Sequence, residues 1–90
     1  MAMTIQPLEK EITIAQPQGL HARPAALFVQ IASKYEAEVV VKKGKEEVNG
    51  KSIMGLLMLA AQQNTKITLR IKGKDALQAM TELEKFLTQP

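Results

Sequence analysis

The sequence predicts an α+β fold, in which one four-stranded, mainly antiparallel sheet is covered by three helices on one face. The expected strands alternate apolar and polar residues, which gives each strand one buried face and one open face. Apolar residues at helical spacing recur between the strands, in the order βαββαβα. At 90 residues the chain has room for one domain of this kind. We therefore expect a single domain over residues 9–90, preceded by a flexible leader of residues 1–8.

The first strand and the first helix are separated by a turn. Apolar and polar residues alternate over 11–14, which predicts a half-buried strand. The segment 16–19, Gln-Pro-Gln-Gly, has the composition of a turn. Pro24 suits the first turn of the following helix, because no N–H is needed there. The apolar stripe of that helix is expected to consist of Leu27, Phe28, Ile31 and Tyr35.

A hairpin and a short apolar helix form the middle of the chain. The alternation over 37–43 predicts a second strand, and Gly44 marks the turn to a short third strand. Ser52 is the expected N-cap of a helix over 53–61, and the polar residues 62–64 end that helix.

The last strand and the last helix complete the pattern. Apolar and polar residues alternate strictly over 66–72, and a turn follows with Asp75 as the expected N-cap. The final helix is expected to bury a stripe of Ala76, Leu77, Met80, Leu83 and Leu87.

Composition excludes several classes of protein. The chain has no cysteine, and its single histidine, His21, has no cluster of carboxylates around it in the sequence, so we expect neither a metal nor another cofactor. The longest apolar run, 53–61, is far shorter than the ~20 residues of a membrane span, and the N-terminus lacks a signal-peptide pattern. We expect a cytoplasmic protein that does not contact membranes.

The segment around His21 is the first candidate site. His21 falls at the boundary between the turn and the first helix, where unpaired N–H groups and the positive end of the helix dipole attract anions. Arg23 adds a guanidinium group that suits phosphate oxygens. A neutral imidazole is a nucleophile, so these residues suit phosphoryl transfer. On spacing alone, the alternative remains that His21 only caps the helix and Arg23 is solvated.

Two sequence motifs resemble those of a known family. Residues 19–25, Gly-Leu-His-Ala-Arg-Pro-Ala, resemble the active-site signature of HPr, the histidine-containing phosphocarrier of the phosphoenolpyruvate-dependent sugar phosphotransferase system. Residues 48–55, Val-Asn-Gly-Lys-Ser-Ile-Met-Gly, are similar to the family's second signature around a regulatory serine. The resemblance covers residues 9–88 and implies an HPr-like open-faced β-sandwich.

The resemblance also implies a function. His21 would accept a phosphoryl group on Nδ1 from phosphorylated Enzyme I, which draws it from phosphoenolpyruvate, and would pass it to enzyme IIA in sugar uptake. Arg23 would contact the phosphoryl oxygens. The protein would be a monomeric relay with a phosphohistidine intermediate rather than a stand-alone catalyst.

The helix over 53–61 is the second candidate site, because nine consecutive positions carry no polar side chain. A small one-sheet domain cannot surround such a helix, so part of it is expected to be exposed, although a locally buried helix is the alternative. The resemblance implies a docking surface for Enzyme I and enzyme IIA that is formed by Ala22, Ala26, Ile53, Met54 and Leu57.

Ser52 is the third candidate. In many family members from Gram-positive bacteria, the matching serine is phosphorylated by an HPr kinase/phosphorylase. The resemblance therefore implies regulation at Ser52 in hosts that have this kinase, and whether the host has one stays open.

Two rival functions remain. A small RNA-binding module has a similar sheet, but it stacks bases on aromatic strand residues, and Phe28, Tyr35 and Phe86 all fall on expected helices. We therefore expect no nucleic-acid partner. An NPr-type carrier of the nitrogen-related phosphotransferase branch is the closer alternative, although Gly55 and the Lys51-Ser52 pair fit the sugar-type pattern better.

Overall fold

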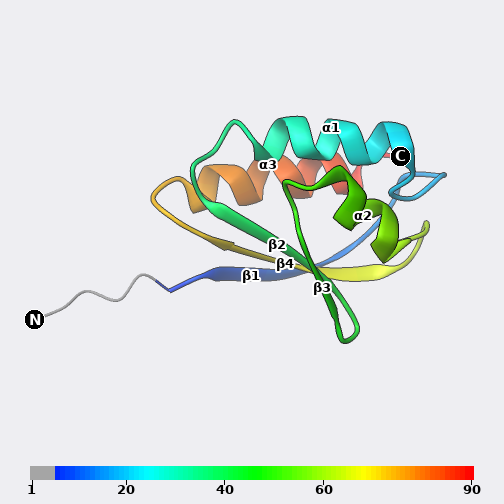
Figure 1. The fold of residues 1–90 in the computed structure, drawn as a ribbon, viewed down its shortest axis with the longest axis horizontal. Helices are drawn as coiled ribbons and strands as arrows, with labels where there is room; N and C mark the ends of the chain where they lie inside the picture. The colour runs from blue at the N-terminus through cyan, green and yellow to red at the C-terminus, as the bar shows by residue number, and fades with distance from the viewer. Residues whose placement is uncertain (1–5) are drawn as a thin grey trace, which may run out of the picture.

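The structure is a computed structural model, and it describes residues 6–90. Its elements follow the predicted order (Figure 1). They are β1 (Leu8–Thr13), α1 (Ala22–Ala32), β2 (Glu38–Lys43), β3 (Glu46–Asn49), α2 (Ile53–Leu59), β4 (Lys66–Lys72) and α3 (Ala76–Thr88).

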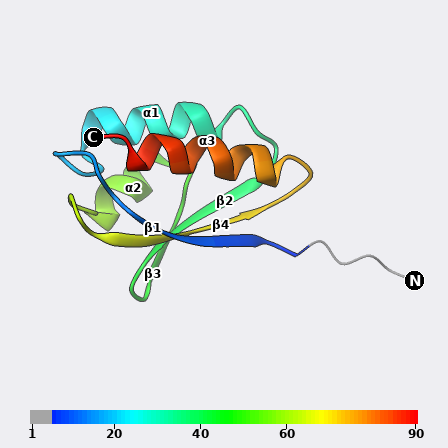
Figure 2. The same cartoon turned by 180° about the vertical axis from the view of Figure 1, so that it is seen from behind.

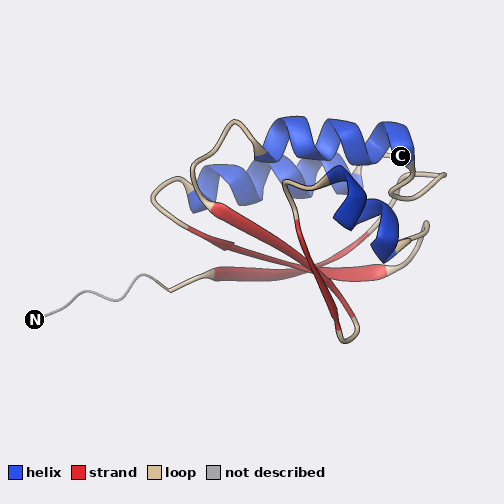
Figure 3. Cartoon of the chain, viewed as in Figure 1, coloured by secondary structure: helices blue, strands red, loops and turns tan. Residues whose placement is uncertain are grey.

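The four strands form one sheet in the order β1-β4-β2-β3, and every neighbouring pair is antiparallel. Val41 of β2 lies opposite Val48 of β3 on one side and Leu69 of β4 on the other, so the apolar positions of neighbouring strands share one face. All the helices lie on that face (Figures 2 and 3). The predicted open-faced α+β sandwich is therefore confirmed.

The core lies between the helices and the sheet. Its large side chains come from all three helices, from the inward positions of the strands and from the β1–α1 loop, and among residues 6–90 no buried residue is polar or charged. The largest fully buried side chains are those of Phe28, Ile14, Leu20, Leu56, Leu59, Ile67, Leu69, Ile71, Leu83, Leu87 and Val41.

The buried faces of α1 and α3 agree only in part with the predicted stripes, since Phe28, Ala76, Met80, Leu83 and Leu87 are buried as expected. Leu27 is 42% exposed and Leu77 is 68% exposed, whereas Ala25, Ala32 and Ala79 are fully buried. The prediction followed the large apolar side chains. The structure instead turns alanines inward, because a small side chain lets a helix approach its neighbour closely at the points of contact.

Two boundaries also differ from the predictions. β1 begins at Leu8, which pairs with Ile71 and so belongs to the sheet rather than to the expected leader, whose residues 1–5 lie outside the described part of the chain. α2 ends at Leu59 instead of residue 61, because Ala60 adopts a left-handed conformation with φ of 53°. The next carbonyl, that of Ala61, accepts a hydrogen bond from the Leu20 N–H at 2.8 Å instead of continuing the helix.

Asp75 occupies the N-cap position of α3, as predicted, but its carboxylate does not cap that helix. Its two oxygens accept the N–H groups of Glu36 and Ala37, both at 2.9 Å, and thereby tie the α1–β2 loop to the start of α3. The hydrogen bond from the Glu36 N–H is the main cause that lowers the pKa of Asp75.

Candidate functional site

His21 occupies the N-cap position of α1, and its side chain is exposed. Its backbone is extended, with φ of −79° and ψ of −171°, and its carbonyl accepts the N–H of Ala25 at 2.8 Å. The imidazole makes no capping hydrogen bond. The ring is therefore available for chemistry, which does not support the alternative that His21 serves only as a cap.

The N-terminus of α1 carries the positive end of the helix dipole, and no acidic side chain in the first turn neutralises it. The first intrahelical hydrogen bond starts at Ala25, so the N–H groups of Ala22 and Arg23 have no partner within the helix. The first turn contains no acidic residue. Arg23 is exposed, and it takes part in none of the ion pairs found among residues 6–90. Such an arrangement favours an anion beside His21.

The β1–α1 loop holds His21 in place through close contact with the α2–β4 loop. Gly19 has a φ of +65°, and a Cβ atom there would lie 2.4 Å from the Ala61 carbonyl oxygen and 2.7 Å from the Gln62 Cα. Only glycine allows this approach without a shift of the backbone. The hydrogen bond from the Leu20 N–H to Ala61 locks the two loops together one residue before His21.

Two hollows flank His21. The polar hollow, of about 650 Å³, is lined by Pro17, Gln18, His21, Gln62 and Gln63. The smaller hollow, of about 110 Å³, is lined by Leu20, His21, Leu57, Ala60, Ala61 and Gln62. His21 therefore lies between a rim of neutral amides and the apolar surface of α2.

The exposed side of α2 is apolar. Ile53, Met54 and Leu57 are 42%, 67% and 37% exposed, while Leu56 and Leu59 are fully buried. Leu57 reaches the smaller hollow, so the structure brings it together with His21. Figure 1 shows α2 beside α1, whose Ala22 is exposed and whose Ala26 is half-buried.

Besides Leu8 and Leu77, two large exposed apolar residues lie outside the predicted docking surface. Met58 is 74% exposed, and its helical spacing of four residues from Met54 is the signal that groups it with that residue. Leu27 of α1 is 42% exposed, but its place in an apolar stripe made it look like a core residue.

Ser52 is the N-cap of α2, as predicted. Its Oγ accepts the N–H of Gly55 at 3.0 Å, and the side chain is half-buried. The neighbouring Lys51 donates its Nζ to the Tyr35 carbonyl at 2.6 Å, which connects this turn to the α1–β2 loop.

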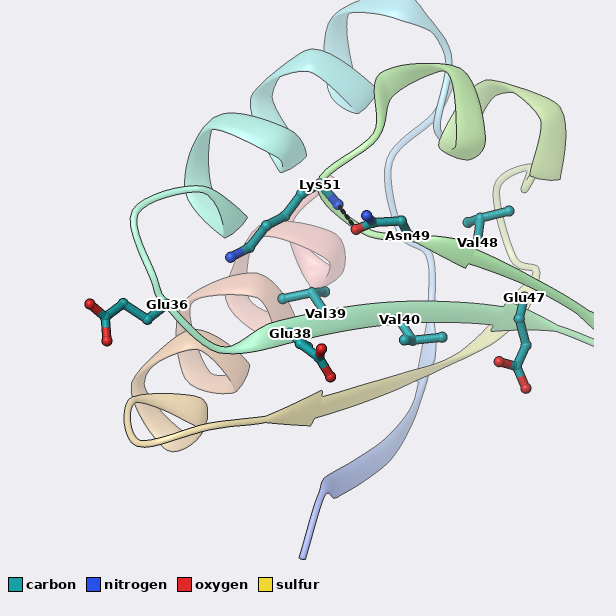
Figure 4. A pocket seen from close by; sticks show the side chains of 8 residues that line it. All are labelled: Glu36, Glu38, Val39, Val40, Glu47, Val48, Asn49 and Lys51. Carbon is teal, nitrogen blue, oxygen red and sulfur yellow. Dashed lines mark hydrogen bonds between the residues drawn. The ribbon is translucent and has the colours of Figure 1, made fainter. Parts of the chain in front are cut away.

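A further hollow lies along β2 and β3 and contains none of the predicted site residues (Figure 4). In it, the Asn49 side chain accepts the Lys51 backbone N–H at 2.8 Å. Its lining residues are Glu36, Glu38, Val39, Val40, Glu47, Val48, Asn49 and Lys51. It has no nucleophile comparable to His21.

The open face of the sheet carries paired charges. Glu47 of β3 bonds Arg70 of β4 at 3.1 Å and lies 3.8 Å from Lys42 of β2, and Lys66 lies 4.0 Å from Glu11. The aromatic residues Phe28 and Phe86 lie on helices, whereas Tyr35, which was expected on the first helix, lies in the loop after α1, because that helix already ends at Ala32. A face of paired charges without aromatic side chains lacks the stacking platform of an RNA-binding sheet.

Residues 6–90 contain neither a cluster of metal ligands nor a membrane-spanning helix. In this range no three His, Cys, Asp or Glu side chains lie close enough together to share a metal ion. No helix in the same range has the length and apolar character needed to cross a membrane.

Comparisons with known proteins agree with the fold and with the motifs. The family model for the PTS HPr component phosphorylation site matches residues 8–89. The phosphocarrier protein HPr of Xylella fastidiosa is 47% identical over 79 residues, which cover 84% of this chain and 89% of the relative. The HPr-like protein Crh of Halalkalibacterium halodurans is 44% identical over 80 residues, with 89% and 95% covered.

Solved structures give the same result. The crystal structure of the phosphocarrier protein HPr from Bacillus anthracis superposes with a TM-score of 0.88 at 38% identity, covering 90% of this chain and 96% of that one. The crystal structure of Crh from Bacillus subtilis, described as a domain-swapped dimer, has a TM-score of 0.73 at 39% identity and covers 89% and 92%. With both signatures in place on the expected fold, the chain belongs to the HPr family of phosphocarrier proteins.

Proposed function

We propose that this protein carries a phosphoryl group on Nδ1 of His21, takes it from phosphorylated Enzyme I, and passes it to an enzyme IIA in sugar uptake. The observation that carries the proposal is the exposed imidazole of His21, without a capping bond, at the open N-terminus of α1. Membership of the HPr family supports the same chemistry.

The transfer exchanges one nitrogen–phosphorus bond for another. The lone pair on Nδ1 of neutral His21 forms a bond to phosphorus while the bond in the donor's phosphohistidine breaks, and that electron pair stays on the donor nitrogen. Each ring keeps the proton on its other nitrogen, so positive charge moves with the phosphoryl group. Transfer to enzyme IIA repeats the same exchange with His21 as the donor.

The surroundings of His21 suit a carrier rather than a tight binder. The exposed Arg23 guanidinium and the unpaired N–H groups at the start of α1 stabilise the phosphoryl oxygens. Because the site is open to water, these interactions are weaker than those of a buried clamp. The phosphorylated form is therefore held without being trapped.

The apolar surface beside His21 is the proposed docking surface. It consists of Ala22, Ala26, Ile53, Met54 and Leu57, extended by Met58. Methionines repack easily, so one such surface can bind Enzyme I and several enzyme IIA domains in turn.

The direct test is the intact mass of the protein after incubation with phosphoenolpyruvate, Mg²⁺ and Enzyme I. We expect one acid-labile phosphoryl group on the wild type and none on the folded His21→Ala variant. Repeating the reaction with the Enzyme I of the nitrogen-related branch separates a sugar-type carrier from an NPr-type carrier. If neither donor phosphorylates the folded wild type, the carrier function is wrong.

Regulation at Ser52 is proposed as a second property of the same surface. A phosphate at the N-terminus of α2 is tolerated by the helix dipole, but it places negative charge at the edge of the docking surface. We expect an HPr kinase/phosphorylase with ATP to add one acid-stable phosphate to the wild type and none to Ser52→Ala. If the Ser52→Ala variant also gains a phosphate, the modified residue is not Ser52 and this proposal is wrong.

We also propose that the carrier acts as a monomer in the cytoplasm. The described residues form one hydrophobic core within a single chain, which supports a monomer. Light scattering on a sizing column at micromolar protein checks this. A dimeric mass would favour an exchange of elements like that described for Crh of Bacillus subtilis.

A further inference from the structure

Gln62 is the residue, besides His21 itself, that lines both hollows beside His21. It lies in the α2–β4 loop, 41 positions after His21 in the chain. Figures 1 and 2 show this loop at the same end of the molecule as the β1–α1 loop. The pairing of the two loops is therefore a product of the tertiary fold.

The backbone of Gln62 is held firmly against the loop that carries His21. Its N–H donates to the Thr65 Oγ1 at 3.2 Å, and its carbonyl accepts the Thr65 N–H at 3.1 Å. Its Cα is one of the atoms that a Cβ on Gly19 would meet, at 2.7 Å. In the same loop, the Asn64 N–H donates to the Ile14 carbonyl at 2.8 Å. The starting point of the Gln62 side chain is thus fixed relative to His21.

The side-chain amide of Gln62 is uncommitted. It is exposed, and within residues 6–90 it makes no hydrogen bond, whereas the neighbouring Gln63 amide donates to the Ala15 carbonyl at 3.3 Å. The Gln63 amide therefore stabilises the contact between the two loops, while the Gln62 amide has two N–H donors available in the hollow that contains His21. Neither hollow is lined by a carboxylate that would compete for these donors or repel an anion.

We propose that the Gln62 amide donates a hydrogen bond to a phosphoryl oxygen on His21 and so stabilises the phosphorylated form of the carrier. This inference rests on the proposed function. Gln62 is then a second side-chain contact for the phosphoryl group, on the side of His21 that faces the α2–β4 loop. As a neutral donor it shifts the equilibrium only modestly, which suits a group that must be passed on.

The experiment measures an equilibrium rather than a rate. Protein, catalytic Enzyme I, phosphoenolpyruvate and excess pyruvate are brought to equilibrium, and the phosphorylated fraction is read by intact mass. Enzyme I cancels from this equilibrium constant, so a variant that only weakens docking slows both directions and leaves the constant unchanged. A lost contact to the phosphoryl group lowers the constant itself.

Gln62→Met keeps the length of the side chain and removes its donors. We expect the equilibrium constant to fall roughly 3- to 10-fold, the effect of one hydrogen bond at a site that is open to water. Gln62→Lys supplies a cationic donor and is expected to raise the constant above the wild-type value, because charged hydrogen bonds are stronger. Changes of opposite sign cannot come from a folding defect. The matched control, Gln78→Met on the exposed surface of α3, is expected to leave the constant unchanged.

The outcomes separate this inference from the function on which it rests. If the wild type is phosphorylated and Gln62→Met has the same equilibrium constant, the carrier function stands and the role of Gln62 is wrong. An equal fall in Gln62→Met and Gln78→Met also overturns that role. If the wild type takes up no phosphoryl group on His21, the proposed function itself fails.

Discussion

At the scale of single residues, the position of His21 depends on a glycine two places earlier. Gly19 combines a left-handed backbone with a contact that leaves no room for a side chain, because the α2–β4 loop passes directly over its Cα. Gly44 has a similar φ of +60°, but nothing lies within 4 Å of the place its Cβ would take. An alanine at Gly44 would therefore meet only backbone strain, whereas an alanine at Gly19 would meet the same strain and a steric clash as well.

We predict that Gly19→Ala destabilises the protein much more than Gly44→Ala. The left-handed conformation costs an alanine about 1–2 kcal/mol at either position. At Gly19 the methyl group also meets backbone atoms, which adds about 1–3 kcal/mol. Urea denaturation of both variants measures the difference. Equal losses of stability would mean that the two loops separate easily and do not hold His21.

At the scale of elements, α2 is a short helix whose two ends are stabilised by different residues. Ser52 caps its N-terminus, and Lys43 of β2 donates its Nζ to the Leu59 carbonyl at 3.1 Å. A lysine near the last carbonyls also favours the negative end of the helix dipole. Ala60 then ends the helix in a conformation that glycine adopts more readily.

We predict that Ala60→Gly stabilises the protein by about 0.5–1 kcal/mol. Glycine removes the strain at a φ of 53°, and its greater freedom in the unfolded chain offsets part of the gain. Ala61→Gly is the control: Ala61 has no positive φ and is only 1% exposed, so this substitution is expected to destabilise. Thermal and urea unfolding measure the stability of both variants. A loss of stability in Ala60→Gly would show that the left-handed backbone of Ala60 is not strained.

The outer face of α2 allows a test of docking. We predict that Met54→Glu raises the KM for phosphorylation by Enzyme I about tenfold, because a charge replaces an apolar contact, and leaves stability nearly unchanged. Leu77→Glu on α3 is the matched control, since the two side chains are 67% and 68% exposed. A similar KM for the two variants would show that Enzyme I does not use α2.

At the scale of the whole molecule, the end of the domain opposite His21 is held by a cluster of polar contacts. Asp75 binds the α1–β2 loop, and Glu82 of α3 accepts hydrogen bonds from Lys34, at 2.6 Å, and from the Tyr35 hydroxyl. The hydrogen bond from Lys34 is the main cause that lowers the pKa of Glu82, and the bond to Glu82 is the main cause that raises the pKa of Tyr35. These contacts join the α1–β2 loop to the start and the middle of α3.

We predict that this cluster loses its contribution to stability in acid. A carboxyl group whose pKa is lowered in the folded state stabilises it above the ordinary pKa, which is 3.8 for Asp75 and 4.5 for Glu82. The free energy of unfolding should therefore decline as the pH falls below about 4.5. The stability gap between the wild type and Asp75→Asn, measured in urea at a series of pH values, should close towards pH 2. A gap independent of pH would contradict the ionic role of Asp75.

The same cluster acts in the opposite direction in alkali. Because the pKa of Tyr35 is raised above 10.0, its contribution is present below pH 10 and is lost as the pH rises through the higher folded value. The Tyr35→Phe variant has no hydroxyl to ionise, so we expect its stability to fall less than that of the wild type above pH 10. Urea midpoints of both proteins at a series of pH values above 10 measure the difference.

Much of this protein follows from short-range chemistry that the sequence displays directly. Alternation identified three of the strands and a turn glycine the fourth, and Ser52 was identified as a cap because a serine oxygen needs only the N–H three residues later. His21 and Arg23 could be placed at a helix N-terminus because a turn and a proline define that boundary locally. The family signatures depend on the same local residues.

Tertiary structure alone decided the features that depend on contacts between distant parts of the chain. The sequence did not indicate that β4 lies between β1 and β2, that Leu77 faces outward, or that Asp75 binds the α1–β2 loop. Gln62 likewise has no sequence signal that connects it with His21, because they meet only when two loops pack around Gly19. Local patterns determine which elements form and where the nucleophile lies, whereas close packing determines which faces are buried and what surrounds that nucleophile.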